Sequence, residues 1–450
     1  MPFKDLREFV ETLRETDQIK HLEGASPDLE IGAVTQLAAE STKCPALMFD
    51  GLESVPRGCR VLTNAIANKT RERLVFGIPV ELSDKDASKL WKDKLKRYEP
   101  IAPTQVADGA VKQNAILGEN IDLHKLPWPR WHQDAGGFCH HGCFAVTRDA
   151  ESGEIGCGLL SLMLVDRNTL LARVSAGYTE PIWEKYWRSG KGCPVAISLG
   201  HDPVLFAAAL IGNGGYGFAG WMRGAPVEVT RGEGGRVPIP AAAEAVLEGE
   251  IAAPAAGQQS ALPQVKIHSM LFRGEPIILG NAPYAGANYG VLSSKAAFVW
   301  NELEALGIPN IAAVNHYDWG CTIVAIKQPY PGHVKRVAHA VLGTSVGRDV
   351  RLVIVVDDDI DPYNLEKVFW AIATRYEPEF ALDIVRRLWS DGSERSGLTN
   401  QRSGTGGSTA IIDACRPYHW IDKFPRTTDI SEELFRKTDA KWRKVLSPDG

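Results

Sequence analysis

Residues 134–156 read DAGGFCHHGCFAVTRDAESGEIG, a stretch in which glycines, two adjacent histidines and short apolar runs follow one another. The apolar run 143–147 predicts a short strand, and the polar residues 149–153 predict the turn that ends it. Further along we expect a strand over 159–165, a helix over 180–187 and a buried strand over 194–199. Helix and strand alternate, so the sequence predicts the α/β class and a functional site in this stretch.

A second concentration of glycine follows at 212–226, which reads GNGGYGFAGWMRGAP. This density predicts a turn at the edge of a sheet, where glycine lets the backbone approach a flat or charged ligand closely. The same glycines equally fit tight turns between strands with no ligand involved. The residues alone leave both interpretations open.

Composition and charge exclude several classes of partner. The chain has 450 residues, 44% of them hydrophobic, enough to bury a large core in two or three domains. The net charge of −5 is small, and no run of lysine and arginine interleaves with aromatics, so we expect no nucleic-acid or membrane partner. Residues 1–16 predict an amphipathic helix rather than a signal peptide, which favours a cytoplasmic protein.

The eight cysteines do not have the spacing of a disulfide scaffold or a zinc ribbon, which again favours a reducing compartment. Cys139 and Cys143 flank His140 and His141, and such a cluster has the ligand types of a metal site. Structural zinc sites usually add a second pair of ligands, and no such pair is evident in the sequence. A metal site here is therefore the less favoured interpretation.

The chain divides into four expected segments. These are an N-terminal α/β domain (1–125), a central domain that carries the site (126–275), a C-terminal α/β domain (276–430) and a terminal helix (431–450). The connection at 126–137, LPWPRWHQDAGG, is rigid and aromatic, so it either walls a pocket or staples two domains together.

Two groups of carboxylates have alternative interpretations. Glu244 and Glu248 share a face if their segment is helical, and for Glu244 a solvated helix face is favoured. The aspartates of 357–361 follow a predicted strand. They fit a magnesium or calcium site, but helix capping near Asp361 and Pro362 is favoured.

The segment 355–375, VVDDDIDPYNLEKVFWAIATR, closely resembles the C-terminal signature of the UbiD family of decarboxylases. Other blocks resemble the family in the same order. They are NAIANKTRERLVFGIP (64–79), LPWPRWHQDAGG (126–137), TRDAESGEIG (147–156), PVAISLGHDP (194–203), FAGWMRGAPVEV (218–229), IPAAAEAVLEGEI (239–251), IKQPYPGHVKRV (326–337) and STAIIDACRP (408–417). The resemblance covers nearly the whole chain.

This resemblance implies a fold and a chemistry. The implied fold is an N-terminal α/β domain, a split-barrel flavin-binding domain and a C-terminal α/β domain whose last helix docks on a partner subunit, giving a homodimer. The implied reaction is reversible, non-oxidative decarboxylation of an aromatic or α,β-unsaturated acid. It uses prenylated FMN with a divalent metal (Mn or Mg) and potassium, and the cofactor carries the difficult carbanion chemistry.

The sequence departs from the family at the positions that hold the metal and the substrate. The family's metal-binding Asn aligns with Gly156, its catalytic Arg with Ser161, its metal-binding His with Thr179 and its metal-binding Glu with Gly215. The stretch that supplies the family's two catalytic glutamates is replaced by residues 252–264, AAPAAGQQSALPQ. The resemblance therefore predicts a rearranged pocket around Gly156, Ser161, Tyr178, Thr179 and Gly215, with the metal site lost and cofactor binding in doubt.

Two hypotheses follow. The first is a decarboxylase of a small aromatic, phenolic or unsaturated acid, with His140 or His141 as the acid or base and Arg173 as a grip for the carboxylate. Adjacent histidines on a strand point to opposite faces, so at most one of them faces a pocket. Arg173 on an exposed strand face, with no role, is an equally good interpretation. The second hypothesis is an inactive binding or structural subunit that partners an active paralogue.

Overall fold

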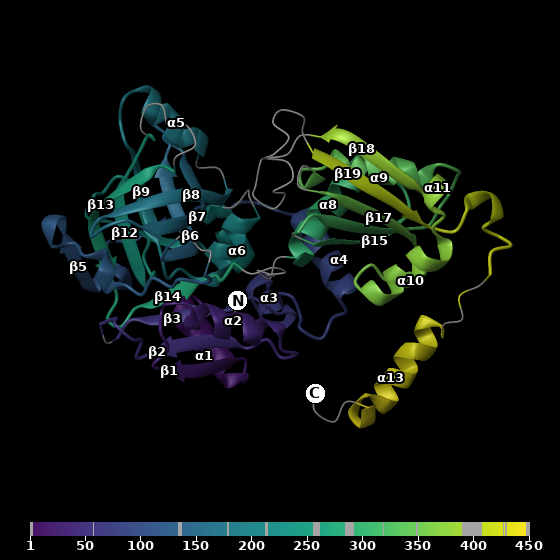
Figure 1. Cartoon of the computed structure of the whole chain (residues 1–450), viewed down its shortest axis with the longest axis horizontal. Helices are drawn as coiled ribbons and strands as arrows, with labels where there is room; N and C mark the ends of the chain where they lie inside the picture. Colours follow the sequence, from purple (N-terminus) through teal and green to yellow (C-terminus); the bar gives the residue numbers. More distant parts are fainter. Residues whose placement is uncertain are drawn as a thin grey trace.

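The chain folds into three bodies of secondary structure and a helix that stands apart from them (Figure 1). This computed structural model describes residues 3–56, 58–133, 137–177, 180–211, 215–254, 262–283, 292–317, 319–347, 350–388, 407–425, 427 and 430–446. Among these residues, no helix combines the length and apolarity needed to cross a bilayer.

The N-terminal body is a small sheet covered by helices. Its elements are α1 (Leu6–Glu15), β1 (Ile19–Glu23), α2 (Glu30–Glu40), β2 (Ala46–Asp50), β3 (Arg60–Thr63), α3 (Lys69–Phe76) and α4 (Asp84–Leu95). Helix α1 begins where Asp5 accepts a hydrogen bond from the Glu8 N–H, and its apolar stripe is buried. The sheet order is β1-β2-β3-β14, so a strand from much later in the chain, β14 (Ile277–Gly280), completes it beside β3.

The central body is a closed barrel of six strands. They are β6 (Cys139–Arg148), β7 (Ile155–Leu164), β8 (Thr169–Gly177), β9 (Cys193–Ser198), β12 (Ala245–Ala252) and β13 (Gln264–Phe272). They run in the order β12-β9-β6-β7-β8-β13, and the pairing of β12 with β13 closes the ring. Alternate residues such as Leu160, Leu162 and Ala172 point inward and fill the barrel.

Shorter elements surround the barrel. They are β4 (Thr104–Gln105), η1 (Ala110–Gln113), β5 (Asn114–Leu117), η2 (Gly118–Asn120), η3 (Leu123–Lys125), α5 (Glu180–Arg188), α6 (Pro203–Leu210), α7 (Tyr216–Arg223), β10 (Glu228–Arg231) and β11 (Pro238–Pro240). Strand β5 pairs with β13, and β4 pairs with β10, so strands from the expected N-terminal segment join sheets of the central one.

Part of the glycine-rich stretch 212–226 is a helix rather than the expected turn. Helix α7 buries Tyr216, Phe218 and Met222, and it packs beside α6 on the outside of the barrel. A side chain at Gly220 would place its Cβ 2.8 Å from the carbonyl oxygen of Ile101. The glycine is therefore required by close packing against the neighbouring backbone, which sequence pattern does not reveal.

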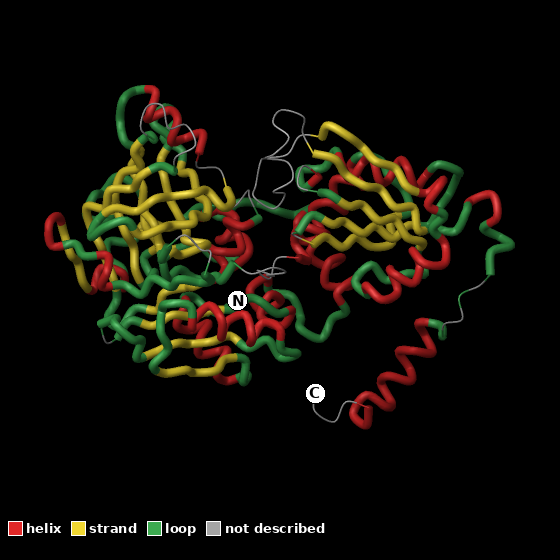
Figure 2. Tube along the Cα trace, viewed as in Figure 1, coloured by secondary structure: helices red, strands yellow, loops and turns green. Residues whose placement is uncertain are grey.

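The C-terminal body is a five-stranded sheet with helices. Its elements are α8 (Leu292–Ala305), β15 (Ile311–Tyr317), β16 (Cys321–Ile326), α9 (His333–Leu342), β17 (Leu352–Asp357), α10 (Leu365–Arg375), α11 (Pro378–Ala381), β18 (Leu382–Leu388), β19 (Gly407–Ala414) and η6 (Tyr418–Trp420). The strand order is β15-β16-β17-β19-β18. Figure 2 shows the strands of this sheet and of the barrel as two separate bodies.

Helix α4 joins the N-terminal body to the C-terminal one. It lies beside α8 in Figure 1, and Glu304 of α8 accepts bonds of 2.6 Å from both Lys92 and Lys96. The Lys92 ammonium also lies over the ring of Trp300, 4.5 Å from its centroid. The two bodies are thus attached through a helix of the N-terminal segment.

Glu244 and two aspartates of the turn after β17 are engaged in ion pairs. Glu244 is fully buried rather than solvated, because Arg7 donates two hydrogen bonds of 2.9 Å to it and Arg273 lies 3.1 Å away. In the acidic turn after β17, Arg375 donates to both Asp357 and Asp359 at 2.8 Å. These carboxylates are therefore neutralised by guanidinium groups rather than arranged for a cation. Within the described ranges, no group of three or more potential ligands is placed to hold a metal ion.

The last helix, α13 (Glu432–Leu446), extends away from the three bodies (Figure 1). Its side chains Leu434, Phe435 and Trp442 are about half exposed, at 51%, 56% and 45%. Such an apolar face on a terminal helix favours a partner that covers it.

The buried His140 and His201 and the half-buried His141 make the stability of the fold sensitive to acid. Burial lowers the pKa of His140 and His141 to about 4 and that of His201 to about 3. Because these folded-state pKa values lie below that of an unfolded histidine, the unfolded chain binds more protons below about pH 6.5. We expect the free energy of unfolding to fall as the pH drops, by about 2 kcal/mol per histidine between about pH 7.5 and about pH 5.

His201→Phe tests this expectation, because the His201 ring stacks on Phe206 and its Nε2 has no hydrogen-bond partner. Urea unfolding of the variant should show a loss between the two pH values that is smaller than in wild type by about 2 kcal/mol. Equal losses in the two proteins would contradict the assignment.

Candidate active site

A bulge in β6 shapes the candidate site. His140 pairs with Leu162 of β7 and Cys143 pairs with Leu160, so His141 and Gly142 together lie opposite the single residue Ser161. Gly142 takes a φ of 75°, a left-handed conformation that glycine adopts without strain. A Cβ at Gly142 would lie 2.5 Å from the side-chain nitrogen of Asn281, so the bulge requires glycine.

The residues on either side of the bulge both point their side chains into the barrel. His140 and Cys143 are both buried in the barrel, and His141 is the only side chain between them that points outward. Asn281, just after β14, donates a hydrogen bond of 3.0 Å from its side chain to the His141 carbonyl oxygen. The position of His141 is thus fixed from the N-terminal sheet as well as from the barrel.

The two adjacent histidines have different environments. His140 is fully buried, its Nε2–H donates to the Pro127 carbonyl oxygen at 2.6 Å, and its ring packs against Trp128 with centroids 4.9 Å apart. His141 is half-buried, and its Nδ1 shares a hydrogen bond of 2.8 Å with the Ser161 hydroxyl. Of the two, His141 is the one placed on the outer face of the barrel.

His141, Ser161 and Arg173 form one row across three strands. Ser161 of β7 lies opposite His141 on one side and is the direct register partner of Arg173 of β8 on the other. The residues that flank Ser161, Leu160 and Leu162, point into the barrel, so Ser161 points outward. We call these three residues the outer row. In Figure 1, the face that carries α6 lies on the side of the barrel towards the C-terminal body.

The surroundings of His141 disfavour its protonated form. Burial is the main cause of its lowered pKa of about 4, and the positive charges of His132 and Arg173 lower the pKa further. The thiol of Cys139 lies 3.3 Å from His141 Nε2, and burial raises the pKa of this thiol to about 11. At neutral pH the site therefore holds a neutral imidazole beside a neutral thiol and a guanidinium.

The other residues of the predicted pocket are only partly described. Gly156 lies in β7 and is the register partner of Thr147, toward the far end of the β6–β7 pair from the outer row. Gly215 is the residue before α7, and the nearest side chain to it is Cys157, whose sulfur lies 3.5 Å from the ideal Cβ position. Tyr178 and Thr179 lie outside the described residues. The two glycines supply no side-chain oxygen or nitrogen to a metal.

Sequence pattern did not identify Cys139 and Asn281 as partners of His141. Cys139 stands two residues away, and the sequence pattern indicates it only as a candidate metal ligand. Asn281 reaches the site because β14 pairs with β3 and ends beside β6. Trp131, from the aromatic connection, donates to the Cys139 carbonyl oxygen at 2.8 Å, and its own carbonyl group packs against Gly32 of α2. This tryptophan thus links the N-terminal domain to the site, as the stapling interpretation predicts.

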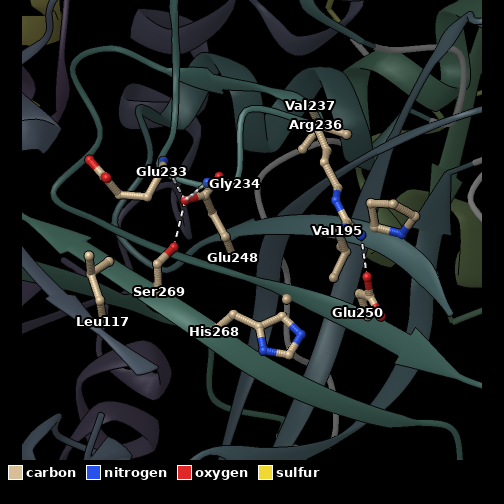
Figure 3. A pocket seen from close by; sticks show the side chains of 12 residues that line it. Leu117, Val195, Glu233, Gly234, Arg236, Val237, Glu248, Glu250, His268 and Ser269 are labelled. Atoms are coloured by element: carbon tan, nitrogen blue, oxygen red, sulfur yellow. Dashed lines mark hydrogen bonds and ion pairs between the residues drawn. The ribbon is translucent and has the colours of Figure 1, made fainter. Parts of the chain in front are cut away.

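A separate cavity of about 400 Å³ lies beneath the β10–β11 connection, on the part of the barrel formed by β9, β12 and β13 (Figure 3). Its Glu248 carboxylate accepts hydrogen bonds from the N–H groups of Glu233 and Gly234 and from the Ser269 hydroxyl. Arg236 and Glu250 form an ion pair on its other side. No residue of the outer row lines this cavity, and most of its polar groups bind one another.

The chain matches the domains of 3-octaprenyl-4-hydroxybenzoate carboxy-lyase in order: the N-terminal domain over residues 10–91, the Rift-related domain over 104–283 and the C-terminal domain over 291–414. These matches define a carboxy-lyase. The chain belongs to the UbiD family, which confirms the resemblance described above.

Individual relatives agree with this assignment. The chain is 31% identical to a pyrrole-2-carboxylic acid decarboxylase from Pseudomonas aeruginosa over 435 residues, covering 85% of this chain and 86% of the relative. A vanillic acid decarboxylase structure from Sedimentibacter hydroxybenzoicus, in an open form, is 26% identical with a TM-score of 0.84, covering 99% of this chain and 100% of that one. The expected α/β fold with a central barrel is therefore confirmed.

A more distant relative is a structure of an evolved dimeric form of the UbiD-class enzyme HmfF from Pelotomaculum thermopropionicum, in complex with prenylated FMN. It is 22% identical to this chain, with a TM-score of 0.78, and covers 96% of this chain and 100% of its own. Gly156 and Gly215, which align with two of the family's metal-binding positions, offer no side-chain donor atom.

Proposed function

We propose that the protein is a non-oxidative decarboxylase, acting reversibly as a carboxylase, of a small aromatic or α,β-unsaturated carboxylic acid, with a phenolic acid favoured. The observation that carries the proposal is His141, a half-buried imidazole hydrogen-bonded to Ser161 on the outer face of a UbiD-family barrel. The names of the relatives support an aromatic acid as the substrate.

The chemistry needs a proton at a defined position. When a phenolic acid loses CO₂, the electrons of the broken carbon–carbon bond return to the ring, and a proton takes the place of the carboxylate. We assign the transfer of this proton to His141 rather than His140. The ring of His140 is enclosed by the barrel core, with one nitrogen on Pro127 and the other without a partner.

Substrate binding would prepare His141 for this role. In the free protein its low pKa leaves it unprotonated at neutral pH. A carboxylate that arrives beside it brings an opposite charge, which favours the imidazolium and raises the pKa towards neutrality. The proton would therefore be present when the acid is bound, which is when the reaction requires it.

His141→Ala should lower turnover by about a hundred- to ten-thousand-fold while leaving the melting temperature nearly unchanged, because a general acid is removed without disturbing the core. The measurement is CO₂ release from pyrrole-2-carboxylate, vanillate and 4-hydroxybenzoate, with and without prenylated FMN. His339→Ala is the matched control, because it removes an exposed imidazole from α9.

A His141→Ala protein that keeps full turnover on an acid used by wild type would overturn the assignment. Wild type that is inactive on every acid, with and without prenylated FMN, would instead favour the second candidate, an inactive subunit that partners an active paralogue. The observation that favours this second candidate is the glycine at both described metal positions.

We also propose that no divalent metal binds where the family binds one. Dialysed protein should contain far less than one manganese or magnesium per chain by elemental analysis, because two of the three ligand positions are glycine and the third is threonine. Near-stoichiometric metal that disappears in Thr179→Ala would show that the site persists. Gly215→Glu is a companion variant that places a carboxylate at one of these ligand positions. The backbone tolerates the change, because φ at Gly215 is −121° and the space there accepts a Cβ.

The four expected segments remain our proposal for the domain organisation, with α13 as a docking helix that makes the protein a homodimer. Deletion of residues 430–450 should reduce the mass measured by light scattering from that of a dimer to that of a monomer, because the exposed apolar face of α13 would be the part that a partner covers. Leu434→Ser with Phe435→Ser tests the same face without truncation. A full-length monomer, or a truncated dimer, would contradict the proposal.

A further inference from the structure

The imidazole of His141 is held at both of its nitrogens. Its Nδ1 shares a hydrogen bond of 2.8 Å with the Ser161 hydroxyl, and its Nε2 lies 3.3 Å from the sulfur of Cys139. Cys139 and His141 are two residues apart on β6, so their side chains share the outer face of the strand. A ring turned over about its Cβ–Cγ bond would place carbon atoms against both partners, so the two contacts fix the orientation of the ring.

Cys139 is itself held in place by the aromatic connection. Its backbone N–H donates to the Pro129 carbonyl oxygen at 3.0 Å, and its carbonyl oxygen accepts from the Trp131 indole at 2.8 Å. Its side chain is buried in a hydrophobic cluster that it forms with residues of the N-terminal sheet. The sulfur therefore lies on the buried side of the His141 ring, whereas Ser161 on the other side is only partly buried.

The two partners of the ring differ in their hydrogen-bonding strength. Burial raises the pKa of the Cys139 thiol to about 11, so at neutral pH the sulfur belongs to a neutral thiol, which is a weak acceptor. The Ser161 hydroxyl can donate its hydrogen to a ring nitrogen. In a neutral His141, the favoured arrangement has the Ser161 O–H donating to Nδ1 and the Nε2–H donating to Cys139.

We propose that Cys139 is a positioning residue for the decarboxylation. Its sulfur accepts the Nε2–H of His141, which leaves Nδ1, on the side of Ser161, as the nitrogen that takes up and gives the proton. This inference rests on the proposed function for its reaction. It adds a residue that does not touch the substrate and acts only through His141.

The proton balance of one turnover closes at Nδ1. When the acid binds, Nδ1 takes a proton from water, and the ring becomes an imidazolium in which both N–H groups donate. As the bond to CO₂ breaks, its electrons return to the substrate carbon, and the Nδ1 proton bonds to that carbon. The ring is then neutral again, with the Nε2–H still on Cys139.

A weak acceptor at Nε2 also keeps the imidazolium a strong acid. A charged N–H gains more from a good acceptor than a neutral N–H does, and a thiol offers little of this gain. Among the described residues, the other titratable groups that act on His141 are His132 of the aromatic connection and Arg173 of β8, and both lower its pKa. Asn281 carries no charge and donates to the backbone carbonyl oxygen of His141. The thiol therefore acts in the same direction as the neighbouring cations.

NMR of the full chain with isotope-labelled histidine tests the tautomer directly. Wild-type His141 should have its hydrogen on Nε2. Cys139→Ala should shift the population towards the Nδ1–H form, because the Nε2–H loses its acceptor while an Nδ1–H can donate to Ser161. Cys139→Ser should keep the Nε2–H form and raise the pKa of His141 by about one unit, because a hydroxyl oxygen is the better acceptor.

Turnover of the acid that wild type uses should follow the tautomer. Cys139→Ala should lower kcat by about ten- to a hundredfold with KM nearly unchanged, because the proton is misplaced while the substrate contacts remain. Cys139→Ser should recover most of this loss. It should also move the alkaline limb of the kcat profile to higher pH, because its imidazolium persists to higher pH.

Cys193→Ala is the matched control, because it removes a buried thiol from β9 of the same barrel. It should match wild type in the tautomer, the pKa of His141 and turnover. Thermal unfolding of every variant checks that the barrel is intact.

The outcomes separate this inference from the proposed function. A wild-type His141 that is mainly in the Nδ1–H form, or a tautomer that stays the same in Cys139→Ala, would overturn the role of Cys139. Full turnover in Cys139→Ala despite a changed tautomer would also overturn it and leave the proposed function standing. Wild type that releases no CO₂ from any acid, but whose tautomer changes in Cys139→Ala, would support the hydrogen bond and remove the decarboxylase assignment.

Discussion

The candidate site depends on the bulge in β6. Counting back from the inward Cys143, strict alternation in an unbroken strand would turn His141 inward and His140 outward. The bulge adds one residue instead, so Cys143 stays in the barrel core while His141 and Gly142 together lie opposite Ser161. Contacts of Gly142 with Phe206 and Asn281 leave no room for a larger residue. Bulges of this kind commonly redirect a side chain next to an active site.

The electrostatics of the outer row follow from this geometry. Because His141 is largely removed from water, the neutral imidazole is favoured, and the nearby cations reinforce that preference. A site with a neutral imidazole, a hydroxyl and a guanidinium, and with no carboxylate in the row itself, suits an anionic ligand. This agrees with the aromatic acids named for the relatives. The chain thus has the family barrel, and the outer face of that barrel carries His141, Ser161 and Arg173.

Much of the fold could be predicted from the sequence because the relevant signals are local. The helix expected over 180–187 is α5, and the strands expected around 159–165 and 194–199 are β7 and β9. Features set by distant partners could not be predicted. Glu244 is buried because Arg7 and Arg273 bind it from far away in the chain, and β14 joins the N-terminal sheet although it follows the barrel.

The candidate site could be predicted only in part, because some of its features are local and others depend on distant partners. The sequence identified the adjacent histidines and their opposite directions, since alternation along a strand is a local rule. Which histidine faces outward depends on the bulge, and the bulge depends on register with β7 and on contacts with Phe206 and Asn281. The pairing of Ser161 with Arg173 likewise required the register of β7 with β8. Register between strands is a property of the assembled sheet, so residue pattern alone does not reveal it.

The bulge places His141 in a desolvated position that the negative charge of a bound carboxylate would complement. The most direct measurement is the pKa of His141 by NMR of isotope-labelled histidine, assigned with His141→Gln, in the absence and presence of 4-hydroxybenzoate. We expect a pKa of about 4 in the free protein and a rise of about one unit or more when the acid binds. A pKa near that of a solvated histidine, unchanged by the acid, would contradict it.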